Sequence, residues 1–339
     1  MKKLFVGIDF AKEKFDVTVV NTVSNETIYC GEFTNTRKGG QSMLRTVRKH
    51  SCGVSREEWL FCGEDTGWYS YVIANYLAEN DYYLWLQNAY CIKRSEGTIR
   101  RGKDDKADSE AIATYARRFC EKAVRYVKPS ENVSALKLLT TKRDLLVKTR
   151  VEIENGVSEI PKMDRQGDAM NTIKASYRSI IRKINDEIKK IEQKMDEITQ
   201  ERDSELATNY EILTSFKGVG RINATYMIVF TDNFRRYDFD ARKICTLYGV
   251  APFGRESGKT LNAKPRVSGM CNHQLKAVIS SAAQAAVLWN GNIKQYYERL
   301  LQKGKCKGVA MNNVKNKIIH ILIAMVREQR KWNPNFALT

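Results

Sequence analysis

Two apolar runs near the start of the chain each end in an acidic residue. Asp9 follows the run Leu4–Ile8, and Glu64 follows the run Trp59–Gly63. Continuous apolar runs of this length are typical of strands that are buried on both faces of a sheet. A buried strand has little tolerance for an unpaired charge, so an acid at the end of both runs constrains the fold strongly. The pattern predicts an α/β sheet with acidic side chains gathered at one edge.

The rest of the first third alternates between strand and helix patterns. Residues 15–19 alternate apolar and polar side chains, and residues 28–33 follow as a third strand. Helical patterns at 37–50 and 68–79 then alternate with the strands at 59–63 and 82–86. From Asp108 onward, apolar residues recur at helical spacing. We therefore expect an antiparallel three-stranded meander followed by β-α-β units, an order that matches a ribonuclease-H-like sheet.

The helical pattern brings two more acids, Asp105 and Asp108, three residues apart. Acids at strand ends and helix starts often do no more than cap or solvate these elements. Four carboxylates that converge would repel one another unless a cation lay between them, and hard divalent cations prefer oxygen ligands. The four acids therefore predict a site for Mg²⁺, with Mn²⁺ as a possible substitute. Basic residues crowd the approach to the helix, which suits a phosphodiester: Lys93, Arg94, Arg100, Arg101 and Lys103.

The charge of the chain points to a polyanionic partner. The 339 residues contain 57 Lys and Arg against 39 Asp and Glu, a formal net charge of +18. Nucleic acid is the first expectation and an anionic membrane surface the second. The N-terminal apolar stretch stops at Asp9, too short for a signal peptide, and the run Ile318–Val326 is too short to span a bilayer. We expect a cytoplasmic protein with no membrane partner.

The eight cysteines do not suggest disulfides or zinc. None of them forms a C-x-x-C pair, and Cys271-x-His273 stands alone. Scattered cysteines in a cytosolic chain are most often reduced thiols.

The middle of the chain has a heptad pattern. Apolar residues alternate steps of four and three over three heptads, with charged residues between them, as in a coiled coil. An earlier helix has leucines in compatible register, and residues 156–167 are expected to form the loop between the two helices. The seam could close within one chain as a helical hairpin or between chains as a dimer contact. The seam consists of Tyr177, Ile181, Ile184, Ile188, Ile191, Met195 and Ile198.

The last third has three candidate phosphate contacts. The run Lys217-Gly218-Val219-Gly220-Arg221 separates two apolar helical segments and resembles a helix-hairpin-helix turn, although a plain tight turn would look similar. A cationic loop follows, and a basic tail then runs from residue 303 to residue 330 with Glu328 as its one acid. The basic residues of the loop and tail are Arg255, Lys259, Lys264, Arg266, Lys303, Lys305 and Lys307.

Taken together, these motifs resemble a known family. The runs Gly7–Lys12, Gly63–Tyr69 and Lys103–Ala113 are similar to the acidic motifs of the DEDD transposases of the insertion-sequence-110 family. That family is related to the Piv-type DNA invertases and has a RuvC-like nuclease domain. The resemblance implies a metal-binding catalytic tetrad of Asp9, Glu64, Asp105 and Asp108. It also implies a serine nucleophile, Ser257, and a phosphate contact at Lys276, where relatives often have arginine.

The resemblance covers nearly the whole chain and implies its organisation. Residues 1–130 would form the RuvC-like nuclease domain, 131–206 a coiled-coil helical spacer, and 207–339 a mainly α-helical serine transposase domain with a basic tail. The expected activity is RNA-guided cutting and rejoining of donor and target double-stranded DNA. A structured guide RNA (bridge RNA) encoded by the element, dimers that pair into a tetramer, and association with the nucleoid are implied in the same way.

Three other functions compete with this interpretation. A Holliday-junction resolvase or RuvC-like nuclease would use metal-activated water, with Ser257 incidental. A sugar-kinase or actin-like ATPase also begins with a strand that ends in Asp, but it needs a Gly-Thr-rich phosphate loop, which Ala11–Lys14 does not provide. A catalytically inactive nucleic-acid adaptor would not need the intact acids and serine.

Overall fold

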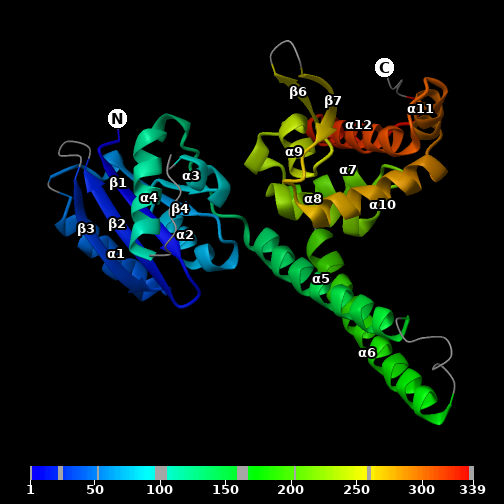
Figure 1. Ribbon diagram of the computed structural model, residues 1–339, viewed down its shortest axis with the longest axis horizontal. Helices are drawn as coiled ribbons and strands as arrows, with labels where there is room; N and C mark the ends of the chain where they lie inside the picture. The colour runs from blue at the N-terminus through cyan, green and yellow to red at the C-terminus, as the bar shows by residue number, and fades with distance from the viewer. Residues whose placement is uncertain are drawn as a thin grey trace. The chain divides into compact units, whose positions relative to one another are not determined.

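The computed structural model describes residues 2–21, 26–51, 53–95, 105–158, 167–201, 204–257 and 261–335. The chain forms two compact units, Met1–Lys128 and Pro129–Thr339 (Figure 1). The boundary lies two residues before the predicted end of the nuclease domain. The predicted helical spacer belongs to the same unit as the C-terminal helices.

The first unit contains a mixed five-stranded sheet in the order β3-β2-β1-β4-β5. β1 (Leu4–Phe10), β2 (Lys14–Asn21) and β3 (Thr27–Thr34) form the antiparallel meander. β4 (Trp59–Glu64) pairs parallel with β1, and β5 (Leu84–Gln87) pairs parallel with β4. The predicted antiparallel meander and the later parallel strands are confirmed, and this mixed sheet with helices is consistent with a ribonuclease-H-like domain.

Helices cover both faces of this sheet because both faces of β1 and β4 are apolar. On one face, Val6 and Phe61 pack with side chains of α1 (Arg37–Lys49) and α2 (Trp68–Glu79). On the other face, Phe5 and Leu60 pack with side chains of α3 (Ala89–Ser95) and α4 (Asp105–Arg118). Short 3-10 turns occupy Arg56–Glu58 and Cys120–Lys122.

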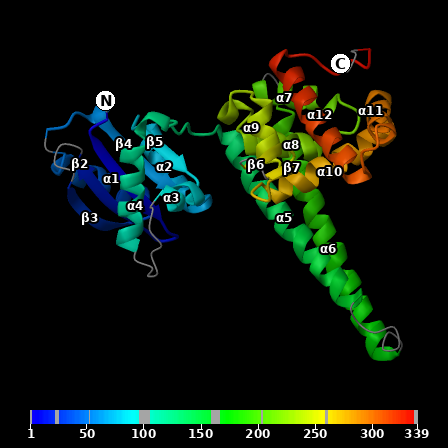
Figure 2. The same cartoon turned by 45° about the horizontal axis from the view of Figure 1, so that its top comes forward.

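The second unit begins with two long helices, α5 (Glu131–Ser158) and α6 (Asp168–Thr199) (Figure 2). They run antiparallel, since Arg143 donates to Glu192 at 2.7 Å while Arg150, further along α5, donates to Asn185 at 2.9 Å. α5 continues two residues past Gly156, so the predicted loop is shorter than expected.

The C-terminal half of the predicted seam on α6 faces into its own chain. Ile188 and Met195 are 7% and 1% exposed, and Ile191 and Ile198 pack against the core of this unit. The structure thus uses the C-terminal half of the seam for intramolecular packing, because the apolar stripe of α6 meets α5 and the helices that follow.

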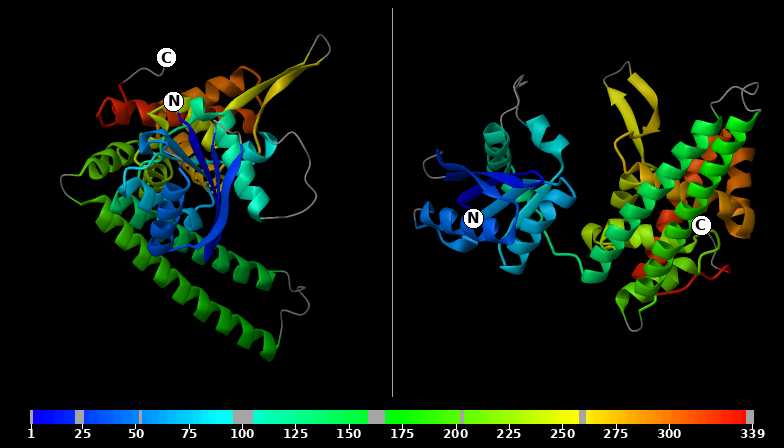
Figure 3. Two further views of the ribbon diagram at one scale, coloured as in Figure 1. Left: turned by 90° about the vertical axis from the view of Figure 1, so that its left-hand side faces the viewer. Right: turned by 90° about the horizontal axis from the view of Figure 1, so that it is seen from below.

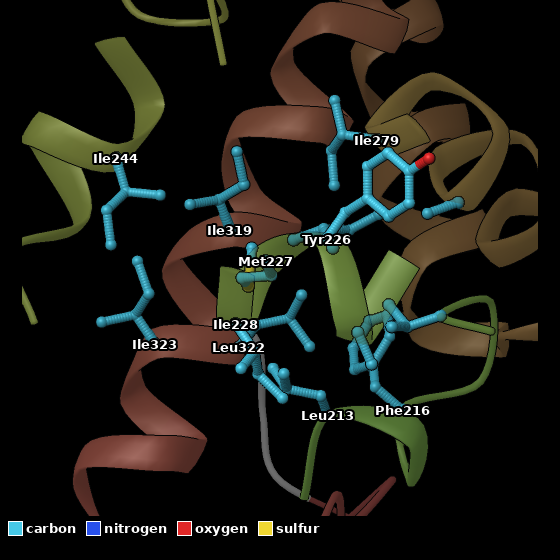
Figure 4. Close-up of a cluster of buried hydrophobic side chains, with 14 of the residues drawn as sticks. Leu213, Phe216, Tyr226, Met227, Ile228, Ile244, Ile279, Ile319, Leu322 and Ile323 are labelled. Atoms are coloured by element: carbon cyan, nitrogen blue, oxygen red, sulfur yellow. The ribbon is translucent and has the colours of Figure 1, made fainter. Parts of the chain in front are cut away.

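The core of the second unit is built by six shorter helices (Figure 4). Their buried side chains, among them Phe216, Tyr226, Ile279 and Leu322, form one continuous cluster. A 3-10 turn at Arg235–Tyr237 lies among them. The helices are α7 (Glu205–Thr214), α8 (Arg221–Thr231), α9 (Ala241–Leu247), α10 (His273–Trp289), α11 (Gly291–Gln302) and α12 (Lys307–Arg327).

The predicted cationic loop is instead mostly a β-hairpin. β6 (Pro252–Ser257) pairs antiparallel with β7 (Leu261–Val267) and stands out from the helices (Figure 3). Its polar composition and the register shift between Phe253 and Arg255 hide the strand alternation in the sequence. Within the described residues, no helix is long and apolar enough to cross a membrane.

Candidate metal centre and nucleic-acid interface

Asp9 is the penultimate residue of β1 and Glu64 the last residue of β4, at the same end of two neighbouring strands. Ile8 pairs with Gly63 in the parallel register, so the two acids occupy adjacent positions. Phe5 and Cys62 belong to the core under α4. Because strand side chains alternate, Asp9 and Glu64 share that face with them. Both acids are half-buried, as expected for charged groups that retain access to solvent or a ligand.

α4 brings Asp108 to the same face. Its neighbour Ser109 is fully buried, and the Ser109 and Thr18 hydroxyls lie 2.8 Å apart. The close approach requires glycine below the helix, since a Cβ on Gly7 would lie 2.2 Å from the Ser109 carbonyl oxygen. Asp108 is half-buried. These contacts fix the N-terminal part of α4 above β1, the strand that contains Asp9.

Part of the predicted site lies outside the described residues. The backbone of Asp105 begins α4, but its side chain is not described. Arg100, Arg101 and Lys103 belong to the undescribed segment 96–104. Lys93 and Arg94 are described: both are exposed on α3, which covers the same sheet face, and the Arg94 guanidinium lies 5.0 Å from the Tyr90 ring centroid. The acids therefore share their face with at least two exposed cations.

A fifth carboxylate, which the sequence patterns did not reveal, lies beside Asp9. Asp16 is the direct cross-strand partner of Asp9, so both side chains point to the α4 face. Asp16 is only 6% exposed. The alternation of residues 15–19 predicted a polar, solvent-facing side for β2. No local signal in the sequence reveals that α4 covers that side.

The donor set suits a hard divalent cation. Half-buried carboxylates at adjacent strand ends are the ligands that Mg²⁺ and Mn²⁺ prefer. Among the described side chains, no three His, Cys, Asp or Glu residues are placed closely enough to hold a metal ion. Asp9, Glu64 and Asp108 are therefore not gathered closely enough to hold an ion as described, and the side chain of Asp105, the predicted fourth ligand, lies outside the described residues.

The Gly-Val-Gly turn connects α7 and α8, but its two glycines differ in role. Gly218 has φ +113°, and a Cβ there would lie 2.7 Å from the Ala286 backbone, so this glycine allows the turn to pack on α10. Gly220 caps α8 and has open space around it. Lys217 is exposed, whereas Arg221 forms ion pairs with Asp196 and with Glu192 of α6. Free backbone N–H groups at the start of α8 suit an anion better than the Arg221 side chain does.

Ser257 is the last residue of β6 and pairs with Leu261 beside the undescribed residues 258–260. Lys259 lies in that undescribed segment. The side chains of Arg255, Ser257 and Lys264 are also outside the described set. Arg266 is exposed on β7 opposite Phe253. The hairpin thus presents the serine backbone at the end of its first strand.

The basic tail is solvent-exposed where α11 joins α12. Lys303, Lys305 and Lys307 are all exposed, and in the described part of the chain none of them is in an ion pair. Lys276 is half-buried in α10. Exposed lysines without acidic partners are suited to contact a phosphate backbone.

Comparison with known proteins places this chain in a family. Residues 6–160 match the DEDD transposase model of the IS110 group, and residues 210–298 match the transposase model of the IS116/IS110/IS902 family. The chain is 22% identical over 340 residues to the pilin gene-inverting proteins of Moraxella bovis and Moraxella lacunata, covering 98% of this chain and 98% of each relative. It is also 22% identical over 395 residues to an uncharacterised 44.8 kDa protein of insertion element IS116 from Streptomyces clavuligerus, covering 98% and 96%. The chain belongs to the IS110 family of transposases.

Proposed function

We propose that this transposase is a site-specific recombinase that cuts and rejoins double-stranded DNA with a divalent metal ion and a serine nucleophile. The observation that carries the proposal is the meeting of Asp9 and Glu64 at one strand edge beneath α4, which also contains Asp108. Family membership adds that such enzymes cut and rejoin DNA.

Asp9, Glu64, Asp105 and Asp108 would hold Mg²⁺, or Mn²⁺ in its place. Such an ion polarises a phosphoryl oxygen and stabilises the charge that develops on it. The protein residues orient the phosphodiester: Lys93 and Arg94 on the same face supply positive charge for the DNA backbone. The half-buried position of the acids strengthens their interaction with a cation compared with acids on an open surface.

Ser257 is the proposed nucleophile. Its Oγ attacks the scissile phosphorus and loses its proton to water, the bond from phosphorus to a deoxyribose oxygen breaks, and that oxygen takes up a proton from water and leaves as the free hydroxyl of the cut strand. The resulting phosphoserine ester keeps the energy of the phosphodiester, so a DNA hydroxyl can attack it and rejoin the strand without ATP. A bare hydroxyl is a weak nucleophile, so Ser257 needs a base or a metal ion to activate it.

The proposal includes the partners that the family resemblance implies. A structured guide RNA encoded by the element would select donor and target DNA by base pairing. Dimers would pair into a tetramer, and the basic segments would bind nucleic-acid backbones. These segments are the turn between α7 and α8 with the exposed Lys217 and Gly220, the β6–β7 hairpin, and the tail at Lys303, Lys305 and Lys307.

The metal proposal is tested with Asp9→Asn and Asp108→Asn. Both variants should retain the fold and bind DNA but fail to cleave it, and EDTA should abolish cleavage by the wild type. Glu32→Gln is a matched control, because Glu32 is an exposed acid on the same sheet that pairs with Lys14. Cleavage that continues undiminished in EDTA would rule out the metal site.

The serine proposal is tested by Ser257→Ala with the DNA ends of the element. Wild-type protein should give DNA fragments that migrate normally on denaturing gels only after protease digestion. Ser257→Ala should bind but neither cut nor form the adduct, while Ser281→Ala, an exposed helical serine, should behave as wild type. If Ser257→Ala cuts at the normal rate and the wild type forms no adduct, water is the nucleophile and the chain acts as a resolvase-type nuclease.

The role of the tail is tested by neutralising Lys303, Lys305 and Lys307 together. The slope of log affinity against log salt should be flatter in the variant than in the wild type. The difference should be up to about one unit for each phosphate contact that the three lysines make. A slope equal to that of the wild type would mean that the tail is only a solvated surface.

A further inference from the structure

The root of the β6–β7 hairpin is fixed by three helices. The Asn312 side chain on α12 donates to the Val250 carbonyl oxygen at 3.0 Å, just before β6 begins. After β7, the backbone N–H of Asn272 donates to the Leu247 carbonyl oxygen at the end of α9 at 2.9 Å. Asn272 is also the N-cap of α10. The strand that ends in Ser257 therefore starts from a rigid junction of α9, α10 and α12 (Figure 1).

Two lysines from different helices lie beside this junction. Lys276 lies one turn into α10, and its Cδ would be 3.6 Å from a Cβ placed on Gly249, which directly precedes Val250. Lys315 lies three residues after Asn312 on α12, on the same side of that helix. Both lysines are half-buried. Burial lowers the pKa of Lys315, and the neighbouring positive charge of Lys276 lowers it further.

Nothing acidic on these two helices compensates the two charges. Neither α10 nor α12 contains an Asp or Glu, and within the described part of the chain neither lysine is in an ion pair. Lys276 also lies near the N-terminal end of α10, where the helix dipole is itself positive. Half-buried like charges on rigid helices are unfavourable in the free protein, and an anion between them would relieve the repulsion.

We propose that Lys276 and Lys315 form a clamp for one backbone phosphate of the DNA strand that Ser257 attacks. The inference rests on the proposed function and adds to it a phosphate position at the hairpin root. Two ammonium groups offer several N–H donors to phosphate oxygens, and the reduced exposure of both lysines limits screening by salt. A phosphate held at the root would set the register of the DNA strand along the hairpin.

The test uses the full-length protein and a short duplex that contains the end sequence of the element. Lys276→Gln combined with Lys315→Gln should weaken binding about tenfold or more at physiological salt and flatten the salt slope by about one unit, as expected for the loss of one phosphate contact. Lys190→Gln combined with Lys194→Gln is the matched control. It removes two charges from exposed lysines of α6 that pair with Glu187 and Glu197 and lie outside the proposed interface.

A scan with a single uncharged methylphosphonate at each position of the duplex identifies the clamped phosphate. Wild type should lose affinity sharply at one position, and the Lys276 and Lys315 double variant should no longer respond there, because coupled partners are not additive. The arginine replacements Lys276→Arg and Lys315→Arg should keep most of the binding. The glutamine double variant should keep or raise the melting temperature, since it removes repulsion.

The outcomes separate the clamp from the general function. If wild type binds and cuts the duplex but the glutamine double variant matches the α6 control in slope and in the scan, the clamp is wrong and the proposed function stands. If the wild type neither binds nor cuts the duplex, both proposals fail. If the glutamine double variant unfolds, the arginine variants decide the question. Folded arginine variants that have lost the binding of the wild type would also overturn the clamp.

Discussion

Gly7 is the position at which fold and candidate site depend most directly on each other. It lies in the middle of β1, two residues before Asp9, with the backbone of α4 resting on it. An added Cβ would lie 2.2 Å from the Ser109 carbonyl oxygen and 2.4 Å from the Ala113 backbone nitrogen. Both contacts are with helix backbone, so no side-chain rotation can relieve them. Gly7→Ala must push α4 away from the sheet.

The size of the effect follows from those contacts. Ordinary carbon contacts lie at about 3.5 Å or more, so the helix must move by roughly 1 Å over this point. Overpacking of a well-packed core costs about 1–3 kcal/mol, and two backbone clashes place Gly7→Ala at about 3 kcal/mol. For a unit of this size, that corresponds to a fall in melting temperature of roughly 10 °C. The same shift moves Asp108 away from Asp9, so metal-dependent cleavage should fall by about a hundredfold or more.

Two other glycines serve as controls for Gly7→Ala. Gly63→Ala would meet the edge of the buried Phe10 ring at 2.4 Å on the opposite face, a side-chain contact and not a helix backbone, so we expect a smaller loss, of about 1–2 kcal/mol. Gly291→Ala begins α11 with no atom within 4 Å and should be neutral. Thermal unfolding and DNA cleavage would be measured for all three. A Gly7→Ala protein with wild-type melting temperature and full cleavage would refute the argument that α4 rests on β1 and positions Asp108.

Two further predictions concern stability. Ile188→Asp should destabilise the second unit by about 3–5 kcal/mol because it puts a charge into the seam, whereas Ile180→Asp, at an exposed position, should cost little. If the Ile188→Asp protein is a folded monomer in sedimentation and its free energy of unfolding equals that of the wild type, intramolecular closure of the seam is contradicted. Hydrogen bonds from Lys128 and Arg37 lower the pKa of Glu79, so its stabilisation is present above its ordinary pKa and is lost as the pH falls. In urea unfolding, the stability advantage of wild type over Glu79→Gln should therefore shrink between pH 6 and pH 3, and a difference independent of pH would be inconsistent with this linkage.

Part of the candidate site could be predicted from local patterns. Asp9 and Glu64 follow continuous apolar runs. A buried run that stops at a charge indicates both the end region of a strand and a candidate metal ligand. Parallel pairing of the two strands then places the two acids side by side, because the carboxyl ends of neighbouring parallel strands lie at the same end of the sheet. The helical spacing after Asp108 similarly predicts the element that carries the third acid.

Other parts of the site depend on contacts between distant segments. The sequence shows Asp16 as one polar residue in an alternating strand, and only the packing of α4 on that face buries it beside Asp9. Arg221 looks like a free phosphate ligand beside a glycine turn, but α6 supplies Glu192 and Asp196 as partners.

The amino-acid order is enough to specify most of the helices and strands, their acidic ends and the positive charge, because strand and helix periods, caps and composition are local properties. Three features needed the folded chain: which face each helix covers, the packing of the C-terminal half of the α6 seam within its own chain, and the positions of Lys276 and Lys315 beside the hairpin root. Burial and charge neighbours are set by residues far apart in the chain, and a one-dimensional pattern contains no information about which distant face will cover it.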